Sequence, residues 1–267
     1  MRFALIQMAV TMDKKENLRA AARFTAEAAK QGADVAVLPE MFFCPYANRY
    51  FPLYAEERGG PAYQAMAAIA RENGVTLVAG SMPERQGDKL YNTSFVFDGE
   101  GREIARHRKA HLFDIDVRGG QRFLESEVFT PGDCATLFTA GGVKLGLCIC
   151  FDIRFPELFR LMALDGAQAV VVPAAFNMTT GPMHWDLSFR MRAVDNQLFT
   201  LGAAPARDEQ GCYVSYAHSI ACSPWGEILS RAGTGQETLL VDVDFSENER
   251  VRSQLPLLSA RRADIYG

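Results

Sequence analysis

The chain has 267 residues, 48% of them hydrophobic, which suits one large globular unit with a sizeable buried core. Its formal net charge is −4, with 28 basic and 32 acidic residues and no block of like charge, so nucleic acid is not an expected partner. Apolar runs are interrupted before they reach the roughly twenty residues that span a bilayer, and residues 1–10 lack the features of a secretory signal. We therefore expect a cytoplasmic protein without a membrane partner.

In the first hundred residues the hydrophobic period changes repeatedly between that of a strand and that of a helix. Gly32 and Gly74 follow the two helical stretches and are typical of helix ends. Asp98-Gly99-Glu100 separates two alternating stretches and predicts a hairpin turn. The predicted elements are strand 2–10, helix 16–31, strand 34–40, helix 63–72, strand 75–81 and hairpin strands 90–97 and 101–108.

The C-terminal half continues this alternation, with predicted strand 143–150, helix 156–164, strand 169–175, a helix near 184–197 and strand 199–206. Alternation of this kind predicts mixed sheets covered by helices, with enough strands for two stacked sheets. No linker or composition shift marks a boundary, so we expect one domain over residues 1–267. The Arg-rich segment 247–267, interrupted by Pro256, is either an arm that packs on a partner subunit or a surface tail.

Cys150 lies where an apolar strand runs into a polar turn, just before a helix that begins at Pro156. Backbone N–H groups after such a residue point toward a developing anion, and the nearby helix start adds a favourable dipole. These features favour a reactive thiol. A cysteine taken alone is nevertheless more often a buried packing residue.

Two charged residues also occupy positions where active sites assemble. Glu40 follows the apolar run 35–38 and Pro39, at the end of a predicted strand. Lys109 ends the basic stretch that begins at Arg106. A solvated loop carboxylate and a solvated basic strand edge are the ordinary alternatives, and the residues themselves leave both open.

The cysteines and histidines give no pattern typical of a metal site. Cys148 and Cys150 share a face if they lie on a strand, and His107 and His111 have helical i, i+4 spacing, but zinc sites usually have wider spacing and more ligands. No Gly-rich phosphate loop of the required form occurs. We expect no metal, no other cofactor, and reduced thiols at residues 44, 134, 148, 150, 212 and 222, since no CxxC pair is present.

Taken together, the candidate residues and their neighbours resemble the motifs of a known family. The sequence resembles the nitrilase (carbon-nitrogen hydrolase) superfamily, whose members have a Glu, Lys and Cys triad in that order. The resemblance covers essentially the whole chain, and with the order of the elements it leads us to expect an α/β fold, a four-layer α-β-β-α sandwich of two mixed sheets flanked by helices. The matching motifs are Leu38-Pro39-Glu40, His107-Arg108-Lys109-Ala110-His111-Leu112 and Cys150-Phe151-Asp152-Ile153-Arg154-Phe155-Pro156-Glu157.

The resemblance implies a chemical role for each of these residues. Cys150 is the nucleophile that forms a thioester with a small linear amide, and Glu40 is the general base that later activates water. Lys109 and the backbone N–H of Phe151 hold the oxyanion. Glu125 matches a second glutamate that relatives place beside the lysine, where it positions Lys109 or the substrate; a surface carboxylate is the alternative, because nothing local distinguishes it from Glu127.

Segments 173–185, 192–197, 204–208 and 216–219 look like the ω-amidase branch, which hydrolyses 2-oxoglutaramate and 2-oxosuccinamate. The far carboxylate of such substrates needs a cation, for which we choose Arg154; a structural ion pair with Asp152 or Glu157 is equally compatible with its position. By resemblance, Thr180, Phe176 and Tyr46 line the remainder of the pocket, with ordinary packing as the alternative.

At two positions the sequence does not specify the ω-amidase branch, and a second substrate therefore remains as an alternative. Phe151 stands where many relatives have Tyr, and Pro156 also occurs in the sister branch that hydrolyses deaminated glutathione. Ureido-acid and carbamoyl-amine amidases are more distant options. Outside the family, a cysteine protease using His184 or His218, or a non-catalytic binding protein, are the rival classes. The resemblance also implies a homodimer or larger homo-oligomer formed by packing outer helices.

Overall fold

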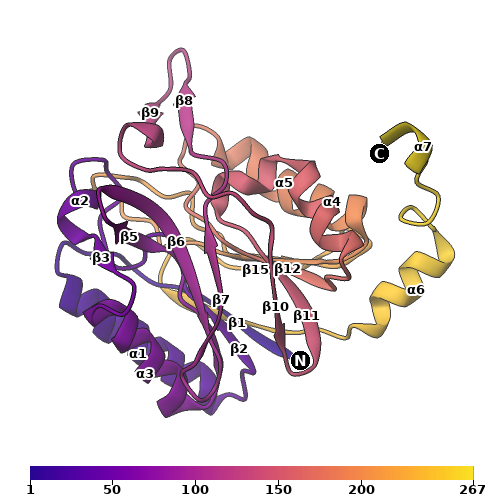
Figure 1. The fold of residues 1–267 in the computed structure, drawn as a ribbon, viewed down its shortest axis with the longest axis horizontal. Helices are drawn as coiled ribbons and strands as arrows, with labels where there is room; N and C mark the ends of the chain where they lie inside the picture. The colour runs from indigo at the N-terminus through magenta and orange to yellow at the C-terminus, as the bar shows by residue number, and fades with distance from the viewer. Residues whose placement is uncertain (267) are drawn as a thin grey trace.

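Two stacked β-sheets form the centre of the fold, and a pair of helices covers the outer face of each sheet (Figure 1). The computed structural model describes residues 1–266. The order of layers is helix, sheet, sheet, helix, which confirms the four-layer α-β-β-α sandwich expected from the sequence.

The first sheet has eight strands in the order β16-β1-β2-β4-β6-β5-β3, with β7 paired to β6. It is mixed, because β1, β2 and β4 are parallel whereas β16 and β6 run antiparallel to their neighbours. Helices α1 (Lys14–Lys30) and α3 (Pro61–Asn73) cover its outer face. Its strands are β1 (Arg2–Gln7), β2 (Val35–Val37), β3 (Glu56–Glu57), β4 (Thr76–Val78), β5 (Met82–Gln86), β6 (Lys89–Phe97), β7 (Glu103–Arg108) and β16 (Glu237–Asp242).

The second sheet has six strands in chain order from β10 to β15. Its central strands β11, β12 and β13 are parallel, and the outer pairs are antiparallel. Helices α4 (Pro156–Leu164) and α5 (Gly181–Asn196) cover its outer face. Its strands are β10 (Thr136–Ala140), β11 (Val143–Leu147), β12 (Ala169–Pro173), β13 (Phe199–Ala203), β14 (Ile220–Cys222) and β15 (Ile228–Arg231).

Alternation along the strands explains how each sheet is buried on both faces. In β1, Phe3 and Leu5 pack between the two sheets, while Ala4 and Ile6 pack under the helices of the first sheet. In β12, Val171 packs between the sheets, and its neighbours face α4 and α5. Because both faces of these strands are buried, they have continuous apolar sequences rather than alternating polar ones.

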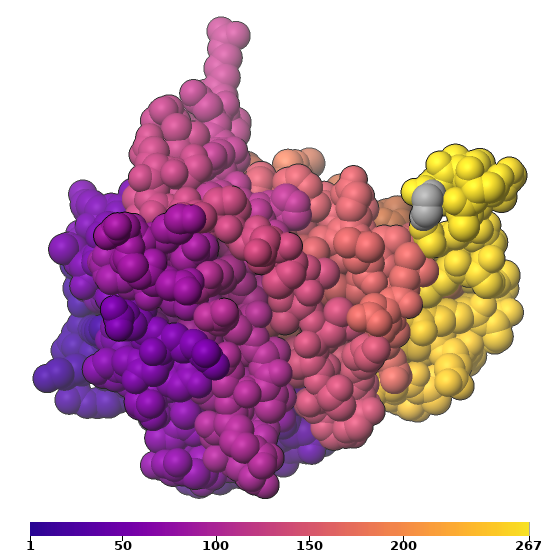
Figure 2. Space-filling model, in the orientation of Figure 1, coloured from indigo at the N-terminus to yellow at the C-terminus, as the bar shows by residue number. Residues whose placement is uncertain are grey.

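Smaller elements complete the chain. Hairpin β8–β9 projects from the body, and α6 and α7 lie at one side of the molecule (Figures 1 and 2). Within residues 1–266, no helix has the length and apolar character needed to cross a membrane. These elements are α2 (Phe51–Tyr54), β8 (Asp114–Asp116), β9 (Arg122–Leu124), the 3-10 turns η1 (Glu125–Glu127) and η2 (Cys150–Arg154), α6 (Ser246–Gln254) and α7 (Ala263–Tyr266).

Several predicted boundaries differ from those in the structure. The strand expected to reach Cys150 ends at Leu147, because the chain turns into η2 with Cys150 at a φ of 46°. Helix α5 begins at Gly181 rather than near residue 184, since Pro182 suits the first turn of a helix. The segment 247–267, expected to be an arm on a partner subunit or a surface tail, contains most of α6 and all of α7, and its last residue, 267, lies outside the described residues.

Candidate active site

Three strand ends bring distant parts of the chain together. Glu40 lies just beyond β2 and Lys109 directly follows β7, both in the first sheet. Cys150 lies beyond β11 of the second sheet. The three side chains are almost completely buried, with exposures of 1%, 0% and 3%. The sandwich therefore assembles this site from both of its sheets.

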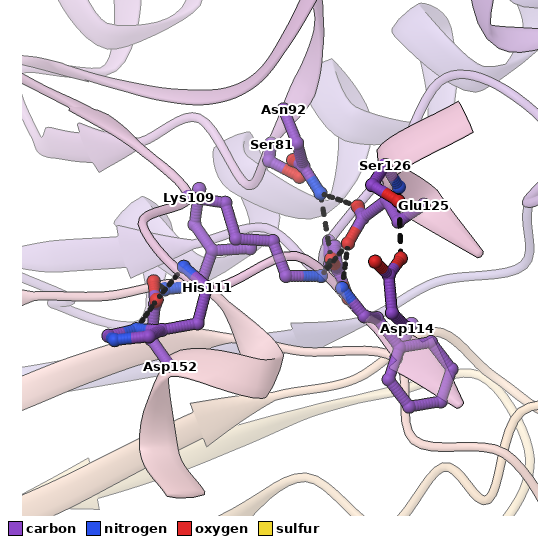
Figure 3. A network of polar contacts seen from close by, with 12 residues as sticks. Ser81, Asn92, Lys109, His111, Asp114, Glu125, Ser126 and Asp152 are labelled. Carbon is purple, nitrogen blue, oxygen red and sulfur yellow. Dashed lines mark hydrogen bonds and ion pairs between the residues drawn. The ribbon is translucent and has the colours of Figure 1, made fainter. Parts of the chain in front are cut away.

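Lys109 is held between two carboxylates. Its Nζ lies 2.9 Å from Glu40 Oε1. It also lies 2.8 Å from Glu125 Oε2 (Figure 3). Burial alone lowers the pKa of Lys109, but the charges of Glu125 and Glu40 outweigh burial and hold that pKa above its usual range. Lys109 is consequently a permanent ammonium ion, which can stabilise an anion but is a poor proton donor.

Glu125 has partners for both of its oxygens. Oε1 accepts a hydrogen bond from Asn92 Nδ2 at 2.9 Å, and Oε2 accepts one from the backbone N–H of Phe113 at 2.6 Å in addition to the contact with Lys109. Burial is the largest influence on this carboxyl and raises the pKa of Glu125. With its oxygens occupied, Glu125 is placed to orient Lys109.

Glu40 differs from Glu125 in having a free oxygen. Oε1 accepts hydrogen bonds from Lys109 at 2.9 Å, from Asn92 Nδ2 at 2.9 Å and from the Tyr46 hydroxyl at 3.2 Å. Oε2 is buried, and no group among residues 1–266 donates a hydrogen bond to it. A buried carboxylate with one unsatisfied oxygen is well suited to accept a proton.

The surroundings of Cys150 favour the protonated thiol. Burial raises the pKa of Cys150 most, and the carboxylate of Glu40 raises it further, whereas Lys109 acts in the opposite direction. The thiol therefore needs a base before it can attack. Its backbone φ of 46° is in the left-handed region that non-glycine residues rarely adopt, and such conformations concentrate at active sites.

A cavity of about 60 Å³ lies next to Glu40. The rings of Tyr46 and Tyr213 form part of its wall, with their centroids 4.6 Å apart. Cys44, Ala175, Asp208 and Cys212 also line it, and its lining in the described part of the chain includes no lysine or arginine.

Residues 2–253 match a protein-family model described as carbon-nitrogen hydrolase. This chain belongs to the carbon-nitrogen hydrolase family. The resemblance seen in the sequence is thereby confirmed, and with it the expectation of an enzyme that acts on carbon-nitrogen bonds.

The similarity to relatives extends over nearly the whole length of the hydrolase. Omega-amidase NIT2 of Bos taurus is 47% identical over 265 residues, which is 99% of this chain and 96% of the relative. Omega-amidase NIT2 of Homo sapiens is 44% identical with the same coverage. A Schizosaccharomyces pombe protein named hydrolase C26A3.11 is 45% identical over 99% of this chain and 83% of its own length.

Solved structures share the fold of the hydrolase. Saccharomyces cerevisiae Nit3, from branch 10 of the nitrilase superfamily, superimposes with a TM-score of 0.89 at 38% identity, covering 98% of this chain and 96% of that one. A mutant amidase from Nesterenkonia superimposes with a TM-score of 0.80 at 28% identity, covering 100% and 98%. In that amidase, acrylamide is joined to the active-site cysteine by Michael addition.

The structure brings together four predicted site residues, Glu40, Lys109, Glu125 and Tyr46. The interpretation of the first three as solvated surface residues is wrong, because their side chains are buried. Phe151, whose backbone N–H was expected to hold the oxyanion, follows Cys150 in η2.

The other predicted pocket residues lie outside the 60 Å³ cavity. Arg154 forms no ion pair with Asp152 or Glu157 in the described chain; its Nη1 lies 3.0 Å from His184 Nδ1. The ring of Phe176 packs edge-on against a buried tryptophan, and Thr180 Oγ1 donates to Asn177 Oδ1 at 3.0 Å.

Asn92 is a site residue that the sequence analysis missed. It lies in β6, and its single amide nitrogen donates to Glu40 and to Glu125, each at 2.9 Å. This amide fixes the two carboxylates relative to each other. The signal was present, because a buried asparagine within a predicted apolar strand needs polar partners, but periodicity does not reveal which ones.

Proposed function

We propose that this hydrolase is an ω-amidase that converts 2-oxoglutaramate and 2-oxosuccinamate to the corresponding acids and ammonia. The observation that carries the proposal is the buried contact of Lys109 with two carboxylates beside the Cys150 thiol. The relatives named omega-amidase, at up to 47% identity over 99% of this chain, support the choice of substrate class.

In the first half of the reaction, the free Oε2 of Glu40 takes the proton from Cys150 Sγ, and the thiolate attacks the amide carbon. The carbon–sulfur bond forms while the carbonyl electron pair moves to oxygen. The ammonium of Lys109 and the backbone N–H of Phe151 stabilise that oxyanion. When the intermediate collapses, the carbon–nitrogen bond breaks, and Glu40 returns its proton to the leaving nitrogen, which departs as ammonia.

In the second half, water cleaves the thioester. Glu40 takes a proton from water as the oxygen attacks the acyl carbon, and the same two donors hold the second oxyanion. Collapse breaks the carbon–sulfur bond, the proton on Glu40 returns to sulfur, and the acid product leaves. The permanent charge of Lys109 suits this cycle, since an oxyanion forms in both halves.

The surroundings of Arg154 support a substrate with a distant carboxylate. Its guanidinium lies over the rings of Phe151 and Phe176, with centroid distances of 5.5 and 4.8 Å, and Nε is buried without a hydrogen-bond partner in residues 1–266. Burial lowers the pKa of Arg154, but a guanidinium stays protonated at neutral pH. An arginine without a carboxylate partner near the nucleophile is suited to bind a substrate carboxylate.

The test is ammonia release from 2-oxoglutaramate compared with deaminated glutathione. We expect a kcat/KM at least about 10-fold higher for 2-oxoglutaramate, because each 1.4 kcal/mol of transition-state binding changes the ratio tenfold. A preference for deaminated glutathione would assign the chain to the sister activity, and the absence of ammonia from either compound would contradict the amidase proposal.

The Arg154→Met variant is the control for the carboxylate contact. Methionine keeps much of the apolar stem of arginine and removes its charge. If Arg154 binds the substrate carboxylate, the variant raises KM for 2-oxoglutaramate but leaves a neutral amide, such as propionamide, unaffected.

We further propose that the hydrolase is a homodimer formed through α4 and α5. Met183, Leu187 and Met191 form an exposed stripe on α5, and Met183 is 76% and Leu187 63% exposed. Leu161 and Leu164 of α4 are also exposed, and a groove of about 840 Å³ separates α4 from the C-terminal segment. Several exposed apolar side chains on neighbouring helices are typical of an interface between subunits.

Sedimentation should show two chains per particle at micromolar concentration. Leu187→Glu would place a charge in the proposed interface and is expected to shift the particle to one chain without unfolding it. A wild-type particle of one chain, or an unchanged mass for Leu187→Glu, would contradict this interface.

A cytoplasmic location is also part of the proposal. All six cysteines are free thiols in the structure, as expected in a reducing compartment. Cell fractionation tests this location, since the chain should appear with cytoplasmic marker enzymes.

A further inference from the structure

The Asp152 carboxylate joins the two chain segments that carry the candidate catalytic groups. It is completely buried. Oδ2 accepts hydrogen bonds from the backbone N–H of Ile149 at 3.0 Å and from His107 Nε2 at 2.9 Å. Oδ1 accepts from the backbone N–H of His111 at 2.9 Å and from its Nδ1 at 2.8 Å. Figure 3 shows Asp152 and His111 beside the backbone of Lys109, away from its ammonium end.

These partners flank the reactive residues on both sides. His107 lies in β7 of the first sheet, two residues before Lys109, and His111 lies two residues after Lys109, beyond the end of that strand. Ile149 and Asp152 flank Cys150 in the turn that follows β11 of the second sheet. One carboxylate thus connects the lysine segment with the nucleophile turn across the two sheets.

We propose that Asp152 is a positioning residue that sets the placement of Cys150 Sγ relative to Lys109, so that the oxyanion forms within reach of its donors. This inference rests on the proposed roles of Cys150 and Lys109. Attack by sulfur and stabilisation of the oxyanion require donors from different sheets to meet at one substrate carbonyl. A misplacement of about 1 Å at such a site can cost about 100-fold in rate.

Only a carboxylate can fill this position. Each oxygen of Asp152 accepts a hydrogen bond from a backbone N–H, that of Ile149 or that of His111. A backbone N–H cannot reverse its role, so an asparagine in either orientation would place an NH₂ group against a donor. Burial disfavours the charge, but hydrogen bonds from His107 and His111 outweigh burial and hold the pKa of Asp152 below its usual range.

The same contacts stabilise an uncommon backbone conformation. Cys150 has a φ of 46°, and such residues persist only where surrounding contacts determine their geometry. Asp152 closes the turn around Cys150 twice, through its side chain to Ile149 N–H and through its own N–H to the Ile149 carbonyl at 3.0 Å. Loss of the carboxylate would free both the turn and its link to the lysine segment.

The experiment compares two reactions of Cys150 in Asp152→Asn. Alkylation by iodoacetamide needs the thiol and its base, whereas hydrolysis of 2-oxoglutaramate also needs the oxyanion donors in place. We expect kcat for hydrolysis to fall about 100-fold while the alkylation rate changes less than about threefold. A purely structural role would lower kcat in proportion to the folded fraction and would speed alkylation, because unfolding exposes the buried Cys150 thiol to iodoacetamide.

Asp98→Asn is the matched control. Asp98 also accepts several hydrogen bonds, from the backbone N–H groups of Glu100 and Arg102 and from Arg102 Nε, but it lies in the turn between β6 and β7. This variant should lower the melting temperature without changing kcat. If Asp152→Asn fails to fold, His111→Ala replaces it, because it removes one side-chain donor and keeps the backbone N–H; we expect about a fivefold loss of kcat with unchanged alkylation.

Two results would overturn the positioning role in an active wild-type enzyme. One is an Asp152→Asn or His111→Ala protein that keeps its full kcat. The other is a loss of kcat in these variants that matches the loss of folded protein and comes with faster alkylation of Cys150. A wild-type chain that releases no ammonia from any amide would instead contradict the proposed function on which this role rests.

Discussion

Cys150→Ala is expected to release ammonia from 2-oxoglutaramate no faster than the uncatalysed reaction, a loss of at least about 10⁴-fold in kcat. Removing Sγ removes the only atom that the proposed mechanism uses to form the acyl intermediate, and alanine offers no replacement. Alanine occupies less space, so the neighbouring Glu40 and Lys109 keep their mutual contact at 2.9 Å. Steady-state ammonia release measures turnover, and calorimetric titration of the variant measures substrate binding, which should persist.

Cys148→Ala is the matched control for this prediction. Cys148 is also a buried free thiol in the same apolar cluster, two residues earlier in the chain, but it has no role in the proposed chemistry. Its replacement should cost about 1 kcal/mol of stability as a small buried group and leave kcat within about threefold. Wild-type turnover by Cys150→Ala would exclude the thioester mechanism.

Lys109→Met is expected to lower kcat by about 1,000-fold, because an oxyanion donor in a dry site contributes on that order. It should also destabilise the fold by about 3–5 kcal/mol at pH 7, since Lys109 is the cation that contacts both Glu40 and Glu125, and all three side chains are buried. Urea unfolding at pH 7 measures the stability loss, and ammonia release measures the loss of turnover.

The stability loss of Lys109→Met should shrink as the pH is lowered to about 5. Burial already raises the pKa of Glu125 in the wild type, and Lys109 opposes that rise. Without the lysine, the folded-state pKa of Glu125 lies further above its unfolded value. A group of this kind contributes stability that is present below the unfolded pKa and is lost as the pH rises through the folded pKa. Acidification therefore favours the folded variant.

A second substitution separates charge from catalysis in this experiment. Glu125→Gln in the Lys109→Met background removes one of the two uncompensated carboxylates, so it should recover part of the stability at pH 7 without restoring turnover. A Lys109→Met protein that is equally stable at both pH values, or that keeps its turnover, would show that the lysine does not balance these carboxylates.

The helices and strands of the fold were predictable from local patterns, whereas the four-layer stacking was expected from the family resemblance. Helix 156–164 has the bounds of α4, because Pro156 suits the first helical turn and Gly166 lies just beyond the end. The continuous apolar run 169–175 predicted a strand, and the structure has β12 over Ala169–Pro173. The positions of Glu40 and Cys150 at strand ends were also predictable. That these two residues lie close together in the fold was not predictable from local patterns, because they follow strands of different sheets. Only the family resemblance led us to group them.

Other features of the site depend on long-range contacts. The local sequence does not distinguish Glu125 from Glu127, yet the fold buries the first beside Lys109 and exposes the second. Arg154 had two acidic neighbours in sequence, but Asp152 is occupied by His107 and His111, and Arg154 instead lies beside His184. The sequence by itself determined the elements, their order and the residue types available for chemistry. The tertiary structure decided which polar groups are buried together, because that depends on how the two sheets stack rather than on the period of any one segment.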